Sequence, residues 1–290
     1  MITVPLLITA VALTVTPSVS DHDQSHRPAG LIALGHSGLT GANSDPNLPG
    51  ADAWQNSWAT GSAPSVNSIA RRMIEIRPET DGNIENAAVA GSPASALTGQ
   101  AVRALGNVPR PALVIIMTID NDIRCDGTDG RHVARLGEHV SNAIDTIATA
   151  SLDSQILLLG QLGRPATFAA ALAQNPDAAR AHAGNSMCDL FDRNGDIDRA
   201  HVAEVTRLVD LYETELDNVC AQVPQCHRDD RALAEFVDDI DELVPGDWNH
   251  LTATGQARIA ETIWPVVAAI LSHTEPTQQA RTVPFPGAGG

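Results

Sequence analysis

Four short apolar runs, which alternate with longer amphipathic stretches, constrain the fold of this chain more than any other feature. The runs cover residues 30–35, 84–90, 112–119 and 155–161, and short, mainly apolar runs of this length are typical of buried parallel strands. Apolar residues at helical spacing occupy 66–76, 94–105, 132–150, 201–223 and 254–271. Strands that alternate with helices predict an α/β protein whose mainly parallel, open sheet carries helices on both faces.

The composition supports a packed core and limits the class of partner. Of the 290 residues, 43% are hydrophobic, which is enough for a sizeable core and excludes a disordered or collagen-like chain. Only 3% are aromatic, so the core depends on Ala, Val, Leu and Ile. The 35 acidic residues outnumber the 18 basic ones and give a net charge of −17. Because such a chain repels phosphate backbones and anionic lipid, we expect no nucleic-acid partner.

The N-terminus has the pattern of an export signal. Residues 6–15 are apolar except for two threonines, and small residues follow at 16–20. This pattern predicts a signal peptide over residues 1–20 and a secreted or periplasmic protein, although residues 2–5 contain no Lys or Arg. The alternatives are a buried first strand and a retained anchor. Ten apolar residues are too few to cross a bilayer as a helix, so we expect no stable membrane insertion.

The rest of the chain is interpreted as one domain followed by a tail. Residues 21–273 show no internal repeat and no linker, and we interpret them as a single domain. Residues 274–290 are rich in Pro, Gly and Gln without apolar periodicity, and we expect a flexible tail there. The sequence leaves the oligomeric state open.

A glycine-rich turn with one serine follows the first predicted strand. Its sequence is Gly-His-Ser-Gly-Leu-Thr-Gly, and the serine is Ser37. Near the C-terminus, Asp247 precedes His250 by three residues, so that a short turn can bring the carboxylate to the imidazole. A serine hydroxyl becomes a good nucleophile when an imidazole accepts its proton and a carboxylate orients that imidazole. We therefore predict Ser37, His250 and Asp247 as a catalytic triad.

Two more strand ends supply candidate donors for an oxyanion. Gly91 follows the second predicted strand and Asn121 follows the third, and reactive groups in open α/β sheets lie at the carboxyl ends of strands. A tetrahedral oxyanion requires hydrogen-bond donors, for which backbone amides and an asparagine side chain are suitable. We predict an oxyanion hole formed by Ser37, Gly91 and Asn121. The neighbouring Asp122 is expected to bind loop amides.

In this order, the four fragments resemble the blocks of the SGNH, or GDSL-type, hydrolase superfamily, including secreted bacterial members. Its Gly-Asp-Ser block is similar to residues 35–37, followed by Gly41, and its second-block glycine is similar to Gly91. Its Gly-x-Asn-Asp block is similar to residues 119–122, and its Asp-x-x-His block to residues 247–250.

The resemblance extends over residues 31–271. It implies a three-layer α/β/α sandwich of flavodoxin type that requires no cofactor or metal and acts on esters or related acyl compounds. Two positions depart from the pattern: His36 replaces the motif aspartate, and Ile119 replaces a glycine. Neither is a residue of the predicted triad, but His36 changes the charge beside the serine.

Segments outside these blocks carry weaker predictions. Trp54 and Trp58 follow the serine turn and either line an acyl pocket or pack in the core. The alanine-rich residues 164–198 are candidates for a cap over the cleft. Within them, residues 192–198 resemble the opening of a calcium loop, but glycine stands fourth instead of sixth, which favours a surface turn.

The four cysteines indicate two disulfides, because an even number in an exported chain is typical of such bonds. Three pairings are possible, and we expect Cys125 with Cys188 and Cys220 with Cys226. The first would tie the loop of Asn121 to the predicted cap. Zinc binding is the competing interpretation, but no Cys-x-x-Cys pair or compact Cys/His cluster is present.

Together these features predict a secreted serine esterase that hydrolyses carboxylic esters through an acyl-enzyme intermediate. The substrate would be a small-molecule, lipid or acylated-carbohydrate ester. An α/β-hydrolase is disfavoured, because its Gly-x-Ser-x-Gly motif lacks the last glycine here. The alternative function is a catalytically silent module on the same fold that binds carbohydrate or lipid. Such a module would be expected to lose at least one of the three triad residues, and all three are present.

Overall fold

The computed structural model describes residues 28–184, 186–234, 236 and 239–273. The predicted signal peptide and the predicted tail lie outside the described residues. Among the described helices, none is both long enough and apolar enough to pass through a membrane.

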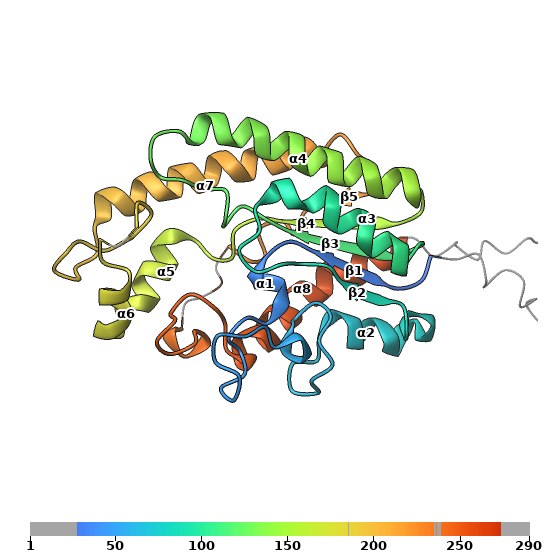
Figure 1. Ribbon diagram of the computed structural model, residues 1–290, viewed down its shortest axis with the longest axis horizontal. Helices are drawn as coiled ribbons and strands as arrows, with labels where there is room; N and C mark the ends of the chain where they lie inside the picture. Colours follow the sequence, from blue (N-terminus) through green and yellow to red (C-terminus); the bar gives the residue numbers. More distant parts are fainter. Residues whose placement is uncertain (1–27, 185, 235, 237–238, 274–290) are drawn as a thin grey trace, which may run out of the picture.

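A five-stranded, fully parallel sheet forms the centre of the molecule (Figure 1). Its order is β2-β1-β3-β4-β5, which is the strand order of flavodoxin-like folds. The strands are β1 (Leu31–Leu34), β2 (Ile84–Asn86), β3 (Leu113–Met117), β4 (Gln155–Leu159) and β5 (Cys226–His227). The predicted α/β class and parallel sheet are thereby confirmed.

The central strands are apolar on both faces because helices cover both sides. In β1, Leu31 and Ala33 belong to one hydrophobic cluster, whereas Ile32 and Leu34 belong to the other. All four side chains are essentially inaccessible to solvent. Successive side chains of a strand point to opposite faces, so a strand buried on both sides is a continuous apolar run in the sequence.

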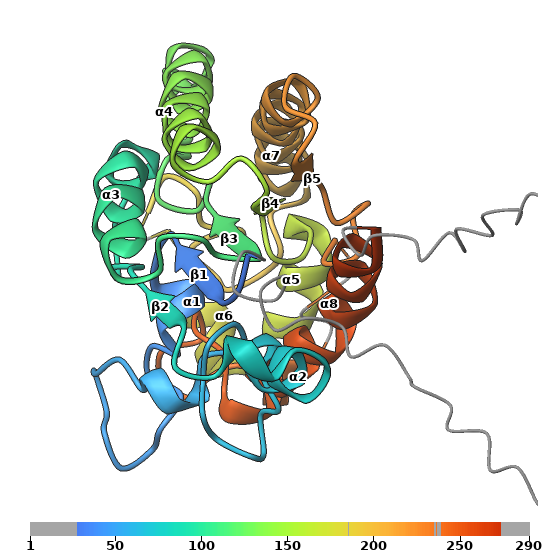
Figure 2. The ribbon, with the colours of Figure 1, turned by 90° about the vertical axis from the view of Figure 1, so that its right-hand side faces the viewer.

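The helices form two layers (Figure 2). One face of the sheet is covered by α3 (Leu97–Asn107), α4 (Asp129–Ala150) and α7 (Arg199–Cys220). The other face is covered by α2 (Ile69–Ile76) and α8 (Ala253–His273), and on this side α5 (Pro165–Leu172) and α6 (Pro176–Ala181) extend beyond the strand ends. The one-turn helix α1 (Ser37–Thr40) follows β1, and short 3₁₀ helices lie in loops: η2 (Trp54–Asn56), η3 (Pro78–Thr80), η4 (Ala94–Ala96) and η5 (Ile240–Glu242).

The structure differs from the prediction mainly in short elements. The second apolar run forms a strand only as far as Asn86, and the chain then turns towards Gly91, which has a φ of +75°. The two-residue strand β5 lacks the length that makes a strand visible in the sequence, and we did not predict it. Helices α5 and α6 are short and alanine-rich, so their apolar periodicity is weak.

Both predicted disulfides are confirmed. Cys125 is bonded to Cys188, and Cys220 is bonded to Cys226. The first joins the loop after β3 to the segment after α6, whereas the second joins the end of α7 to β5. The two bonds therefore lie in different parts of the fold, and only the first reaches the carboxyl ends of the strands.

Candidate active site

Ser37 is the first residue of α1 and lies in a sharp turn directly after β1. Gly35 has a φ of +147°, and a Cβ atom there would lie 2.2 Å from the Met117 carbonyl oxygen, so the turn requires glycine. The buried side chain of Gln100 fixes this peptide, because it accepts from the Gly35 N–H at 2.7 Å and donates to the Gly35 carbonyl at 2.9 Å. Gly41 ends α1 in the left-handed conformation.

Trp58 also contacts the turn that carries Ser37. Its side chain is fully buried, and its Nε1–H donates to the Gly38 carbonyl at 2.9 Å. Trp54 is 44% exposed, and neither tryptophan belongs to the residues that line the cavity beside Ser37. The suggestion that they form an acyl pocket is therefore wrong, and Trp58 instead belongs to the core.

Asp247 and His250 contact each other as their spacing predicts. The Nδ1 atom of His250 lies 2.7 Å from Asp247 Oδ2, and Asp247 Oδ1 accepts from the N–H groups of Asn249 and His250, each at 2.9 Å. The Asn43 side-chain amide also donates to Asp247 Oδ2. Partial burial alone would raise the pKa of Asp247, but the hydrogen bonds from His250 and Asn43 lower it below its usual range.

This arrangement sets the tautomer of His250. A carboxylate that stays ionised can only accept, so the Nδ1 atom carries the proton and donates it to Asp247. The lone pair of the neutral ring is then on Nε2. An imidazole in this state can accept a proton from a hydroxyl group.

Ser37 and His250 line the same cavity, which has a volume of about 370 Å³. Among the described residues, the Ser37 hydroxyl has no hydrogen-bond partner and is available to a ligand. The apolar side chains of the lining come from several elements: Met117, Ile123, Leu162, Pro165, Phe168, Leu190, Val205, Val209, Leu243 and Leu251. The polar residues of the lining include Asp120, Asn121, Asn249 and His250.

The candidate oxyanion donors are placed differently. Asn121 lines the cavity, and its Nδ2 lies 3.3 Å from the Ser92 carbonyl. Gly91 is exposed and lies outside the lining residues, so the structure does not bring it to the cavity wall.

Ile119 has a φ of +108°, a strained conformation for a β-branched residue, which explains why a glycine suits this position. As expected, Asp122 accepts from a loop amide, that of Ala94.

His36 pairs with an acidic residue of a neighbouring strand end. Its Nδ1 accepts from the Gly38 N–H at 3.2 Å, and its Nε2 lies 3.0 Å from Asp120 Oδ2. His36 is buried and both residues line the cavity. The acidic partner therefore lies on the loop of Asn121.

The segment predicted as a cap forms one wall of the cavity. Between residues 164 and 198, the lining residues are Arg164, Pro165, Phe168, His182, Ser186, Cys188, Asp189 and Leu190. Residues 192–198 form a turn in which Asp192 accepts from the N–H groups of Asn194 and Asp196. Helices α5 and α6 extend past the carboxyl ends of the strands, the end of the sheet at which α1 lies (Figure 1).

Sequence reasoning missed two residues of this region. Asn43 contacts Asp247 across a separation of 204 residues, and no local pattern reveals such a contact. His182 also lines the cavity, and its Nε2 lies 3.0 Å from the Trp248 carbonyl oxygen.

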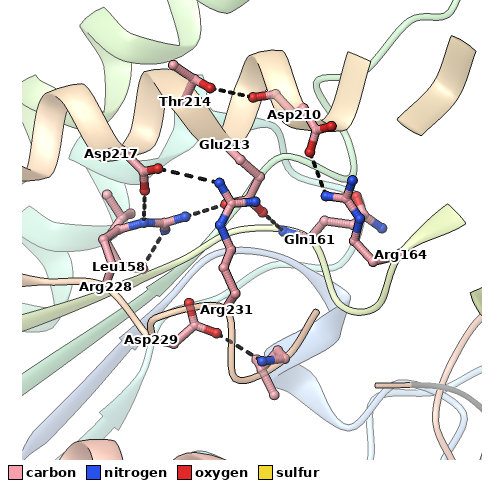
Figure 3. A network of polar contacts seen from close by, with 11 residues as sticks. Leu158, Gln161, Arg164, Asp210, Glu213, Thr214, Asp217, Arg228, Asp229 and Arg231 are labelled. Atoms are coloured by element: carbon pink, nitrogen blue, oxygen red, sulfur yellow. Dashed lines mark hydrogen bonds and ion pairs between the residues drawn. The ribbon is translucent and has the colours of Figure 1, made fainter. Parts of the chain in front are cut away.

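A network of charged side chains contacts the end of β4 and the loop that follows it (Figure 3). Glu213 Oε1 accepts from the Gln161 N–H at 2.8 Å, and Glu213 Oε2 pairs with Arg228. The Arg228 guanidinium also donates to Asp217 at 2.8 Å and to the Leu158 carbonyl at 2.6 Å. This network fixes the position of Gln161, which lines the cavity.

Comparisons with known proteins place the fold. No family model and no curated protein sequence matches the chain. The extracellular lipase of Streptomyces rimosus has a similar structure, with a TM-score of 0.51 and 16% identity, over 83% of this chain and 99% of the lipase. TesA has a TM-score of 0.48 and 16% identity over 83% of this chain and 99% of its own.

A carbohydrate esterase of family 2 from Corynascus thermopiles (Myceliophthora fergusii) has a TM-score of 0.49 and 12% identity, over 89% of this chain and 69% of that protein. The likeness to the Streptomyces lipase confirms the predicted resemblance to SGNH hydrolases at the level of the fold.

Proposed function

We propose that the protein is an exported serine esterase in which Ser37 is the nucleophile, His250 the general base and Asp247 the group that orients His250. One observation carries the proposal. An imidazole that donates Nδ1–H to a carboxylate of lowered pKa lines the same cavity as Ser37, which lies on a sharp strand-to-helix turn and whose hydroxyl has no partner within the described part of the chain. Export is supported by the two disulfides, which are typical of oxidising compartments.

The reaction follows from the roles of these groups. Ser37 Oγ attacks the ester carbonyl carbon while its proton passes to His250 Nε2, and the carbonyl oxygen becomes an oxyanion. When the C–O bond to the alcohol breaks, His250 returns the proton to the leaving oxygen, and an acyl-enzyme remains. Water then attacks the acyl carbon with His250 again as the base, which releases the acid and restores Ser37.

The Ser37 N–H and the Asn121 side-chain amide are the proposed oxyanion donors on the cavity wall. Asn121 lines the cavity with Ser37. The Gly91 amide remains the proposed third donor. Gly91 precedes Ser92, whose carbonyl accepts from Asn121. Fixed donors of this kind stabilise the charge that develops in the transition state.

The cavity favours an apolar acyl group over a sugar. Its lining includes Ile123, Leu162, Phe168, Val205 and Val209, and apolar surface favours the burial of an alkyl chain. The volume of about 370 Å³ is at the lower end of ligand pockets, which commonly span roughly 300–1,000 Å³. We therefore propose esters of short to medium acyl chains as substrates.

The test is a series of p-nitrophenyl esters from acetate to laurate, run beside an acetylated polysaccharide. We expect kcat/KM to rise from acetate to a maximum at an intermediate chain length and to fall again at laurate, with little release of acetate from the polysaccharide. A preference for the polysaccharide would refute the proposed acyl class. Hydrolysis of neither kind of ester would refute the esterase function itself.

A further inference from the structure

His182 links the wall formed by residues 164–198 to the turn that holds His250. It directly follows α6, and its Nε2 lies 3.0 Å from the carbonyl oxygen of Trp248. A carbonyl oxygen only accepts, so His182 Nε2 carries the proton and donates it. Its ring meets Phe168 edge-on, with the centroids 5.5 Å apart and the planes at 90°. The imidazole is therefore held from two sides.

The Trp248 peptide belongs to the turn that carries Asp247 and His250. Trp248 lies between Asp247 and His250 and has a φ of +52°, a conformation that bulky residues rarely adopt. Its N–H donates to the Val244 carbonyl at 2.9 Å, whereas its carbonyl faces His182. A hydrogen bond to that carbonyl restricts the rotation of this peptide, two residues before His250.

A second anchor lies six residues further along the chain. Cys188 is bonded to Cys125, which belongs to the loop after β3 that also carries Asn121. His182 and Cys188 both line the cavity. One wall of the cavity is therefore tied at two points, to the loop of the proposed base and to the loop of the proposed oxyanion donor.

We propose that His182 is a positioning residue for His250, and that His182 and Cys188 together set the distance between the base and the oxyanion donor. The inference rests on the proposed function. In a reaction of this kind, a displacement of about 1 Å can lower the rate by up to roughly a hundredfold. His182 acts through the Trp248 carbonyl and takes no proton from the substrate.

The test compares three variants with a small, water-soluble acetate ester. His182→Phe keeps a ring against Phe168 but loses the donor, and His182→Gln retains an N–H donor. His201→Phe is the matched control, because His201 Nε2 lies 2.9 Å from the carbonyl of Met187, also in residues 164–198, yet His201 does not line the cavity. We expect His182→Phe to lower kcat about tenfold with KM within about twofold. His182→Gln should recover most of this loss, and His201→Phe should stay within about twofold of the unmodified protein.

A second readout does not depend on turnover. The Nδ1 proton that His250 shares with Asp247 should give a low-field proton NMR signal in protein with ¹⁵N-labelled histidine, assigned by its absence in His250→Gln. We expect His182→Phe to shift or broaden this signal, and His201→Phe to leave it unchanged. If the unmodified protein hydrolyses no ester, the proposed function fails, but the NMR signal still decides the positioning role.

Three results would overturn the inference. An increase in KM with unchanged kcat would make His182 a substrate contact. An equal loss in His201→Phe would point to general loosening of the wall, and unchanged kcat and NMR signal in His182→Phe would remove the positioning role altogether.

The disulfides supply an independent comparison. We expect the double variant Cys125→Ser/Cys188→Ser to lose several-fold in kcat per folded molecule, because it releases the second anchor. The double variant Cys220→Ser/Cys226→Ser lacks the other bond, at the end of α7, and should keep kcat. Equal kcat in the two double variants would contradict the role of Cys188.

Discussion

Two carboxylates that each bond to a residue of the cavity lining, Asp247 to His250 and Glu213 to Gln161, have opposite environments. Asp247 accepts from two backbone amides, from Asn43 and from His250, and these hydrogen bonds lower its pKa against the effect of partial burial. Burial raises the pKa of Glu213, and the neighbouring Arg228 opposes that effect (Figure 3). The side chain of Asp247 is 15% exposed and that of Glu213 is 7% exposed.

The difference separates a reactive role from a structural one. Asp247 is held by directed, mostly neutral donors and keeps its charge, which is what a group that orients an imidazole requires. The two carboxylate oxygens of Glu213 accept from Arg228 and from the Gln161 N–H, and Glu213 thereby fixes the loop after β4. Changes to the reactive groups beside Asp247 should therefore have their largest effect on the rate, whereas changes near Glu213 should have their largest effect on the stability.

The largest expected effect is on the reactive side. Ser37→Ala removes the proposed nucleophile and should lower kcat for a short activated ester by roughly a thousandfold or more. The unfolding temperature should change little, because the hydroxyl has no hydrogen-bond partner among the described residues. Ser272→Ala, at the exposed end of α8, is the control and should keep full activity. Full activity of Ser37→Ala would refute the triad.

The corresponding change on the structural side is Arg228→Met. It leaves Glu213 buried without its partner, which should cost about 3–5 kcal/mol of unfolding free energy in urea. Turnover per folded molecule should stay close to normal. Arg207→Met breaks an exposed ion pair with Glu204 and should hardly shift the urea midpoint. If Arg228→Met instead lost turnover at unchanged stability, the separation of the two roles would be wrong.

Asn121 lies between these extremes, because it could act in the reaction or merely hold its loop. Asn121→Ala should lower kcat about a hundredfold with KM within a few-fold, a loss of about 3 kcal/mol in the transition state. Asn83→Ala removes a similar side-chain bond, to the Glu79 carbonyl in an exposed loop, and should leave kcat unchanged. A lower melting temperature with near-normal turnover per folded molecule would make Asn121 structural.

The parts of the site that could be predicted are those that depend on local sequence. Asp247 and His250 are three residues apart, and Ser37 follows an apolar run, so their chemistry is visible along the chain. The parallel sheet accounts for the position of Ser37 at the carboxyl end of β1, whereas the turn of Asp247 and His250 lies between η5 and α8. Asn43 and His182 could not be predicted, because their contacts with the Asp247 turn cross 204 and 66 residues.

The smallest expected effect concerns pH. The folded-state pKa of Asp247 is lowered, so its contribution to stability is fully present above about pH 4, the ordinary pKa of an aspartate, and is lost as pH falls through the folded value. Asn43→Ala removes one of the hydrogen bonds that lower this pKa. The variant should be less stable than the unmodified protein at pH 5 to 7, and the difference should shrink towards pH 2. Urea midpoints at several pH values test this, and a difference that is constant with pH would exclude Asp247 as its cause.

The central claim is that His250 activates Ser37, and the reaction with a fluorophosphonate tests it most directly. Mass spectrometry of the intact protein and its peptides would follow adduct formation over time. We predict a single adduct on Ser37, formed at least a hundredfold more slowly in His250→Gln. An adduct on another residue, or an equal rate in the two proteins, would contradict the claim.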